Sequence, residues 1–181
     1  MIDIQTLYQE AIRFAGNRHL ENNQTVKGTR LPYVVHLSNV AMEIFVAAMH
    51  TPVFDLGFAI QVALLHDTLE DTSTTFTELT KRFGEDIAVA VLALSKNDKL
   101  PKEKQIPDSL ERIKGLRKEV YAVKLADRIT NLQPPPSDWD RVTLIRYRDD
   151  SRLILEAMKE GNRYLAERLS TKIEEYSKYI H

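Results

Sequence analysis

The densest group of side chains that could do chemistry in this sequence lies between His66 and Asp71. Four of these residues are ionisable: His66, Asp67, Glu70 and Asp71. On a helix they would fall within one arc of about 140°. They follow the apolar run Val62–Leu65, and charged groups that enter a buried stretch are unfavourable unless something compensates them. A divalent cation would do so, because imidazole with carboxylate suits manganese, iron or zinc. The alternative is a solvated acidic helix end.

Two residues far from this segment could join it. His36 shares a helical face with Val40, so it is expected to point into the core, as either a hydrogen-bonded core histidine or a ligand. Asp127 stands in a mostly apolar stretch, and a buried aspartate needs a cation or several hydrogen-bond donors. Lys124 and Arg128 are the alternative partners, but only Lys124 lies one helical turn away from Asp127.

Together these residues predict a metal site with ligands from three separate helices. They would bring two imidazoles and two carboxylates to one ion and leave positions open for water and substrate. The set is His36, His66, Asp67 and Asp127. A second metal would need further histidines, and the others do not suggest convergence. His19 and His50 are interpreted as ordinary polar-surface or helix-end residues, and His181 as part of the tail. We therefore expect a single divalent metal.

The elements that must position these residues are predicted to be helices. Apolar residues recur at three- and four-residue spacing, and no stretch of useful length has the two-residue period of a strand. The predicted fold is all-α, with about eight helices. They are expected at about residues 4–20, 33–49, 55–71, 75–84, 85–96, 109–132, 139–160 and 162–178, with a possible break near Gly115. Thr75 with Glu78 forms a capping box, and Ser137 or Asp138 should cap the helix after the three prolines. Residues 97–108 are lysine-rich and are expected to form an exposed loop.

Composition narrows the class of protein further. The chain has 181 residues, of which 43% are apolar and 28% charged, and its formal net charge is −1. This balance excludes a strongly basic nucleic-acid coat protein. Without cysteine, the chain has no disulfides and no thiolate metal site, which suits a reducing compartment. The first residues do not resemble a signal peptide, and the longest apolar run is far shorter than the roughly 20 residues that span a bilayer. We expect a cytoplasmic globular protein of one domain, with no membrane or nucleic-acid partner.

Three segments carry a family resemblance, and each is built around one part of the predicted metal site. They are Leu31–His36 with Val40-Ala41 behind it, Ala63–Thr72 followed by Phe83-Gly84, and Val123–Leu132. They resemble the PYxxH…VA, ALLHDxxEDT…FG and VKLADRxxNL segments of RelA/SpoT-type (p)ppGpp hydrolases, which are HD-domain metal-dependent phosphohydrolases. Pro135-Pro136, Trp139 and Arg146-Tyr147 are similar to the ending of the stand-alone members, the small alarmone hydrolases, which include the animal SpoT homologue. The resemblance covers about residues 7–158, ahead of the last helix at about 162–178.

The resemblance implies a fold, a reaction and roles for individual residues. It implies an HD-domain helical bundle over residues 1–181, with one metal, usually manganese, in its core. The metal ligands of the family match His36, His66, Asp67 and Asp127. Glu70 and Asp71 match its catalytic acidic pair, and Asn131 matches its nucleotide-contacting asparagine. The implied reaction is hydrolysis of the 3′-pyrophosphate of (p)ppGpp, the alarmone of the stringent response, to GTP or GDP plus pyrophosphate.

One stretch departs from the family pattern and leaves the base preference open. Family members usually carry arginine-lysine ahead of the PY segment, whereas Val26–Leu31 places its basic residues in a different register. Lys27 and Arg30 are therefore the candidates for that substrate contact, and Arg146 is a candidate contact to phosphate. Trp139 is interpreted as a packing anchor. The altered stretch keeps a second hypothesis open, an HD phosphohydrolase of another nucleotide such as an adenine alarmone or NADPH. A third is a catalytically silent nucleotide-binding domain; the oligomeric state is undetermined.

Overall fold

The structure is a computed structural model that describes residues 3–180 of the chain. Within that range it contains ten α-helices, one short 3₁₀ helix and no β-strand. The elements are α1 (Ile4–Glu21), α2 (Val34–Met49), α3 (Leu56–Leu65), α4 (Thr68–Asp71), α5 (Phe76–Phe83), α6 (Glu85–Leu94), α7 (Lys102–Ile113), α8 (Lys118–Asn131), α9 (Arg141–Met158), α10 (Arg163–Tyr176) and η1 (Ser177–Tyr179). The predicted all-α class is confirmed. His181, interpreted as tail, lies outside the described residues.

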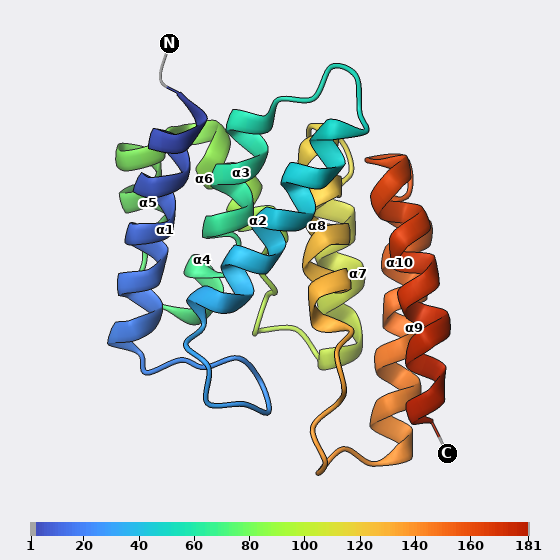
Figure 1. Cartoon of the computed structure of the whole chain (residues 1–181). Coiled ribbons are helices and arrows are strands. Elements are labelled where there is room, and N and C mark those ends of the chain that lie inside the picture. Colours follow the sequence, from blue (N-terminus) through green and yellow to red (C-terminus); the bar gives the residue numbers. More distant parts are fainter. Residues whose placement is uncertain (1–2, 181) are drawn as a thin grey trace.

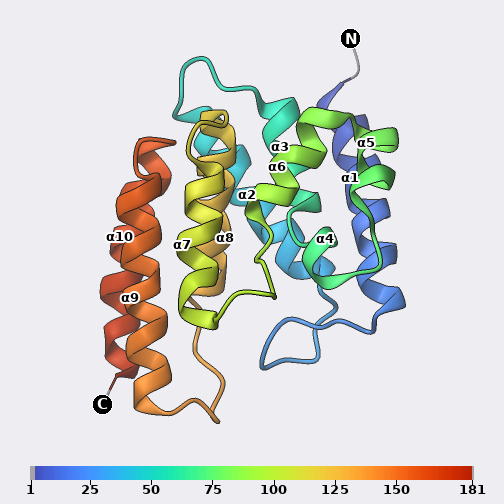
Figure 2. The same ribbon diagram turned by 180° about the vertical axis from the view of Figure 1, so that it is seen from behind.

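The longer helices run roughly side by side, as Figure 1 shows. Helices α1 and α5 form one edge of the bundle, and α9 and α10 form the other, with α2, α3 and α8 between them. Figure 2, the view from behind, shows α6 and α7 on the opposite side. Buried side chains from α1–α3 and α5–α10 join in one hydrophobic cluster. This is the expected result when each helix contributes one apolar stripe to a shared core.

Three connecting segments gather at one end of this bundle. Residues 22–33, 95–101 and 132–140 all lie in the lower half of the molecule in Figures 1 and 2, and the short helix α4 lies beside them. These segments are far apart in sequence, but the packing of the helices brings them together. Connecting segments on a rigid scaffold are common positions for binding residues. The chemically capable residues identified in the sequence lie at or near this end.

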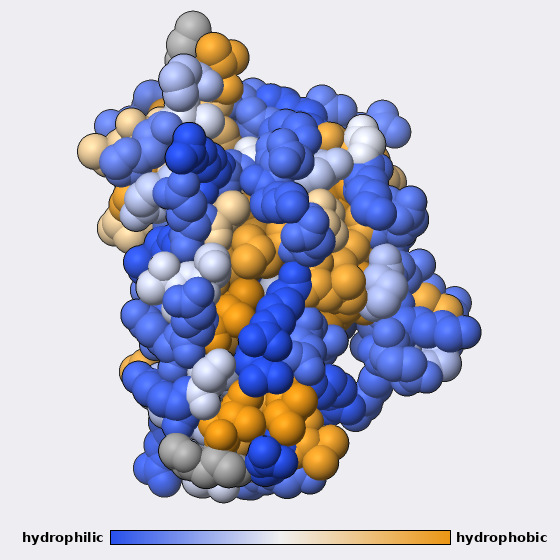
Figure 3. All heavy atoms as spheres, turned by 90° about the vertical axis from the view of Figure 1, so that its right-hand side faces the viewer, coloured by the Kyte–Doolittle hydropathy of each residue, from blue (hydrophilic) through white to orange (hydrophobic). Residues whose placement is uncertain are grey.

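The outer side of α9 and α10 is mostly hydrophilic. Figure 3 shows that hydrophobic side chains gather in the middle of this side and near its lower end, among polar residues. Val142 and Leu153 are exposed apolar residues of α9, and scattered residues of this kind are normal on protein surfaces. No helix within residues 3–180 has the length and apolar character needed to cross a membrane.

The third expected helix is interrupted at His66 and Asp67, which gives α3 and α4 instead of one continuous helix. The carbonyl groups at the end of α3 find local partners that stop the helix. Thr68 Oγ1 donates to the Leu65 carbonyl at 2.7 Å, and His66 Nδ1 donates to the Ala63 carbonyl at 2.8 Å. Side-chain hydrogen bonds of this kind compete with the helical pattern. The break corrects the prediction of one continuous helix.

The expected exposed loop over residues 97–108 is wrong in its second half. Helix α7 begins at Lys102 and contains Pro107 in its first half. A proline early in a helix removes one hydrogen bond, but the helix can still form when its apolar face is buried. Leu110 and Ile113 supply that face, since both are buried in the core. Tertiary packing here outweighs the lysine- and proline-rich composition on which the prediction rested.

Other predicted boundaries have mixed outcomes. The break near Gly115 is confirmed, and this glycine has a φ of +91°, a value that favours glycine. Thr75 caps α5 as predicted, with its side chain accepting a hydrogen bond from the backbone. The cap of α9 is Asp140 rather than Ser137 or Asp138, because a turn after the prolines delays the start of the helix. Asp140 Oδ1 accepts a hydrogen bond of 2.8 Å from the backbone N–H three residues further on.

The contact between the start of α10 and α8 yields a stability prediction. A Cβ atom on Gly161 would lie 2.2 Å from the Tyr121 Cβ atom, so the two helices would have to move apart. We predict that Gly161→Ala lowers the free energy of unfolding by about 1–3 kcal/mol. Gly16→Ala is the matched control: it lies within α1 with room for a Cβ atom, and should raise stability by about 0.5–1 kcal/mol. Urea denaturation measures the free energy of unfolding of both variants. Equal stability of the two variants would contradict the close approach of Gly161 to Tyr121.

Candidate functional site

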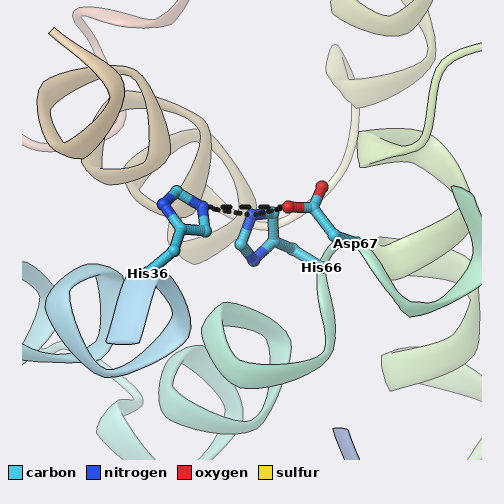
Figure 4. Close-up of side chains that lie close together, drawn as sticks. All are labelled: His36, His66 and Asp67. Carbon is cyan, nitrogen blue, oxygen red and sulfur yellow. Dashed lines mark hydrogen bonds and ion pairs between the residues drawn. The ribbon is translucent and has the colours of Figure 1, made fainter. Parts of the chain in front are cut away.

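Three side chains from α2 and from the junction of α3 and α4 meet at one point, as Figure 4 shows. His36 comes from α2, His66 follows the last residue of α3, and Asp67 occupies the break before α4. Their ligand atoms lie within 4.8 Å of one another. The two Nε2 atoms are 3.4 Å apart, and Asp67 Oδ2 lies 2.8 Å from His66 Nε2 and 3.7 Å from His36 Nε2. Both histidines are buried, as the sequence predicts for His36.

Asp127 brings a second carboxylate to this group from α8. Its Oδ1 atom lies 3.4 Å from His36 Nε2 and 3.6 Å from His66 Nε2. Its other oxygen is 3.9 Å from Lys124 Nζ, the neighbour one helical turn away that the sequence indicates. The structure therefore brings together all four residues that the sequence analysis proposed as ligands. We call His36, His66, Asp67 and Asp127 the metal cluster.

The metal cluster fits a divalent cation. Ligand nitrogen and oxygen atoms lie about 2.1 Å from such an ion, so neighbouring ligand atoms are about 3 Å apart. The separations between each histidine Nε2 atom and the other ligand atoms are 2.8–3.7 Å. Because His66 Nδ1 donates to a backbone carbonyl, the Nε2 atom of the neutral ring presents a lone pair toward the centre. Two imidazoles and two carboxylates suit a divalent metal.

The cluster carries strong mutual electrostatic interactions. Burial alone would lower the pKa of His66, but the carboxylates of Asp67 and Asp127 outweigh burial and raise it well above its usual value. Burial alone would raise the pKa of each carboxyl group. The opposing effect of the histidines is larger and lowers the pKa of both Asp67 and Asp127. Each charge in the cluster thus depends on the others for its stability.

Two polar side chains hold the carboxylates of the cluster in place. The Tyr33 hydroxyl donates to Asp67 Oδ2, and burial with the nearby negative charge raises the pKa of Tyr33. Asn131 Nδ2 donates to Asp127 Oδ1 at 2.5 Å. The ring of Tyr33 also packs on that of His19, with 4.6 Å between centroids. Hydrogen bonds to metal-ligating groups fix their orientation.

His19 differs from its interpretation as a polar-surface residue. It does lie near the end of α1, but it is 1% exposed. Its Nδ1 atom is hydrogen-bonded to Gln24 Oε1, and its Nε2 atom is buried without a partner. Burial lowers the pKa of His19, so the neutral ring donates from Nδ1 to the amide oxygen. His50, by contrast, is exposed at the end of α2, as expected, and stacks on Tyr164.

The acidic pair Glu70 and Asp71 lies beside the cluster, and each member has a different partner. Glu70 accepts hydrogen bonds from the backbone N–H and the ammonium group of Lys96, at 2.7 and 2.6 Å. Asp71 accepts a hydrogen bond of 2.8 Å from Gln24 Nε2. Burial, with the negative charge of Asp67, raises the pKa of Asp71. The two carboxyl groups therefore differ in environment although they are adjacent in sequence.

A cleft of about 560 Å³ opens onto the cluster. Its lining includes His36, Asp67, Glu70, Asp71, Asp127, Asn131, Lys27 and Arg146. A second recess of about 680 Å³ shares His36, Asn131, Lys27 and Tyr147 with it. In this recess the Lys27 ammonium lies 4.4 Å from the centroid of the Trp139 ring. Arg30 is exposed and lines neither space. We call the first space the central cleft and the second the side recess.

A scan against protein families matches the HD domain over residues 11–142. The chain belongs to the HD-domain family. Its relatives include the guanosine-3′,5′-bis(diphosphate) 3′-pyrophosphohydrolases MESH1 of Danio rerio and Homo sapiens. Each is 30% identical, with 88% of this chain and 88% or 89% of the relative covered. The enzyme of the same name from Aquifex aeolicus is 34% identical over 69% of this chain and 17% of its own length.

Solved structures agree with this assignment. A metazoan orthologue of SpoT, reported to hydrolyse ppGpp, superposes with a TM-score of 0.81 at 25% identity, covering 93% of this chain and 94% of that protein. A protein of Listeria monocytogenes superposes with a TM-score of 0.61 at 21% identity, covering 81% and 96%. The second likeness concerns the fold alone. The HD-domain bundle expected from the sequence is thus confirmed.

Several residues around the metal cluster were not identified from the sequence. Tyr33 could have been found, because it precedes His36 by three residues and so points to the same side as that histidine. Gln24 and Lys96 had no such signal, since both lie in connecting segments outside the helices. Helical periodicity predicts which face of a helix is buried. It does not predict which loop residues will meet that face.

The electrostatic interactions of the metal cluster predict how pH affects the stability of the metal-free protein. Because folding raises the pKa of His66, its contribution to stability is complete below its usual pKa of about 6.5. The contribution disappears as pH rises through the higher folded value. The lowered pKa values of Asp67 and Asp127 have the opposite consequence: their contribution is lost as pH falls below the usual value of 3.8. Metal-free protein should therefore become less stable toward alkaline pH.

Unfolding midpoints measured with chelator from about pH 6 to about pH 9 test this expectation. The metal-loaded protein should show the opposite trend, since a metal ion competes with protons for the histidine. His66→Ala is the control, because it should remove the alkaline loss in the metal-free protein. A metal-free midpoint that rises over this range would contradict the predicted electrostatics.

Proposed function

We propose that this HD-domain protein is a manganese-dependent hydrolase that removes the 3′-pyrophosphate of guanosine tetra- or pentaphosphate, releasing GDP or GTP and pyrophosphate. The observation that carries the proposal is the position of the metal cluster, which lies on the central cleft next to two carboxyl groups of different environment. The relatives named for this reaction support the choice of substrate. Among the divalent metals that suit imidazole and carboxylate, manganese is proposed because the hydrolases that the sequence resembles usually hold it.

The proposed reaction assigns a different role to each residue beside the metal cluster. A bound divalent ion supplies Lewis acidity at the phosphoryl group and activates water. Glu70 and Asp71 line the same cleft as the cluster, where either carboxylate can accept the proton of the attacking water. Asp71, whose pKa is raised, is also suited to supply a proton to the leaving ribose 3′ oxygen. Lys96 keeps the Glu70 carboxylate in one orientation through two hydrogen bonds.

Basic and amide side chains of the same cleft would bind the substrate. Lys27 and Arg146 supply positive charge to phosphate oxygens, and Asn131 offers an amide next to Asp127. Of the two basic residues of the altered stretch, Lys27 is preferred over Arg30, since Lys27 lines both the central cleft and the side recess. The side recess is large enough to extend the binding surface beyond the phosphates.

We predict that metal-loaded protein releases pyrophosphate from ppGpp and that a chelator abolishes the release. Pyrophosphate is measured by a coupled enzymatic assay, with a hydrolase of known activity as the positive control. Adding manganese back should restore the rate, because the ligands are already assembled by the fold. Protein with stoichiometric manganese that leaves ppGpp intact would contradict the proposal. Turnover of an adenine alarmone or NADPH under the same conditions would then redirect it to another nucleotide.

The proposed roles predict different consequences for neighbouring substitutions. His66→Ala and Asp67→Ala should lower manganese occupancy, because each removes a ligand. Glu70→Ala should keep the metal and reduce turnover by about 100-fold or more, because it removes a proton acceptor. Elemental analysis of purified variants and the pyrophosphate assay separate the two effects. Glu111→Ala, an exposed residue paired with Lys114, is the control and should retain both. Equal loss of metal in the three site variants would refute this division of roles.

A further inference from the structure

Arg128 follows Asp127 on α8 but is turned about 100° around the helix axis from it. Asp127 faces the two histidines of the metal cluster. Arg128 faces α9, where its guanidinium carbon lies 4.5 Å from the centroid of the Tyr147 ring. Arg128 is 6% exposed. Asp127, Arg128 and Tyr147 all line the central cleft. Arg128 is thus part of the cleft wall on the α9 side.

The guanidinium group of Arg128 has no polar partner among residues 3–180. Its Nε and Nη1 atoms are buried and make no hydrogen bond, and no acidic side chain in this part of the chain forms an ion pair with it. Asp150 is near enough to feel its charge: burial raises the pKa of Asp150, and Arg128 opposes that rise. Arg168 shows the usual alternative, since it donates two hydrogen bonds to Glu43 at 2.6 and 2.7 Å.

A buried arginine without a partner is unfavourable, because its N–H groups lose their hydration and gain no hydrogen bond in exchange. The face of the Tyr147 ring attracts the cation, but it offers no oxygen to the N–H groups. An anion that enters the cleft would provide such oxygens. The positive charges of Lys124 and Arg146, which line the same cleft, would favour its entry.

We propose that Arg128 is a substrate-binding residue that donates hydrogen bonds to a phosphate group on the α9 side of the central cleft. A phosphate matches a guanidinium group because its oxygens accept several N–H donors at once. The identity of the nucleotide rests on the proposed function, but the inference that an anion binds here rests on Arg128 itself. The phosphate comes from either the 3′-pyrophosphate or the 5′-diphosphate, which present the same anionic oxygens.

Calorimetric titration of the full-length, manganese-loaded protein with three probes tests the proposal. The probes are inorganic pyrophosphate, GDP and guanosine, and the variants are Arg128→Gln and Arg128→Lys. We expect Arg128→Gln to weaken binding of at least one phosphate-bearing probe by about 10-fold or more and to leave guanosine unchanged. The probe that loses affinity identifies the phosphate. Arg128→Lys, which keeps the charge, should lie between Arg128→Gln and the wild type. Arg168→Gln is the control and should bind all probes normally, because Arg168 lines neither the central cleft nor the side recess.

Two outcomes would overturn the proposal. Unchanged affinity of Arg128→Gln for both phosphate-bearing probes would show that no phosphate contacts Arg128. Equal weakening of all three probes, guanosine included, would show that the substitution deforms the cleft. These titrations do not depend on turnover, so a protein that fails to hydrolyse ppGpp still reports on Arg128.

Thermal unfolding separates a binding role from a structural one. A side chain retained for stability should lower the unfolding midpoint when it is replaced. A buried side chain without a partner should not, so Arg128→Gln is expected to keep or raise the midpoint without ligand. The increase in midpoint on adding the affected probe should shrink in this variant. A lowered midpoint together with an unchanged response to the probe would assign Arg128 a structural role and contradict the proposal.

Discussion

Two imidazoles and two carboxylates meet in the core where α2, α3 and α8 pack together, and charged groups in such a place must compensate one another. Their separations leave room for a cation, and neighbouring charges rather than burial alone shift the pKa values of His66, Asp67 and Asp127. This requirement explains the interruption of the helix at His66 and Asp67. The break lets two adjacent residues contribute ligand atoms to one point. A continuous helix would direct their side chains about 100° apart.

Polar side chains around the metal cluster also compensate its negative charges, because they donate hydrogen bonds to the carboxylates. Tyr33 and Asn131 donate to the ligand carboxylates, and Gln24 and Lys96 donate to the adjacent acidic pair. Each negative group near the cluster therefore has a donor that limits its rotation. Arg128 is the contrasting case, a buried positive group that no described residue satisfies. Hydrogen bonding is well satisfied around the metal cluster and incomplete at Arg128 in the wall of the central cleft.

Much of this fold could be predicted from the sequence, because local periodicity determines which side of each helix is buried. His36 and Asp127 could be linked to His66 because each is a polar residue in a mostly apolar context. The start of α7 could not be predicted in this way, since burial of Leu110 and Ile113 depends on the packing of other helices. The same limit applies to Gln24 and Lys96. Their positions depend on the paths of connecting segments, which carry no periodic pattern.

The division between helices and connecting segments has an evolutionary consequence. The metal cluster is carried by packed helices and by the break between two of them, whereas Lys27 and Trp139 of the side recess lie in connecting segments. Such segments tolerate insertions and substitutions far better than a packed core does. A lineage could therefore change which nucleotide it accepts by altering these segments, while the hydrolytic centre stays intact. The altered register of Val26–Leu31 is the kind of variation through which such a change would proceed.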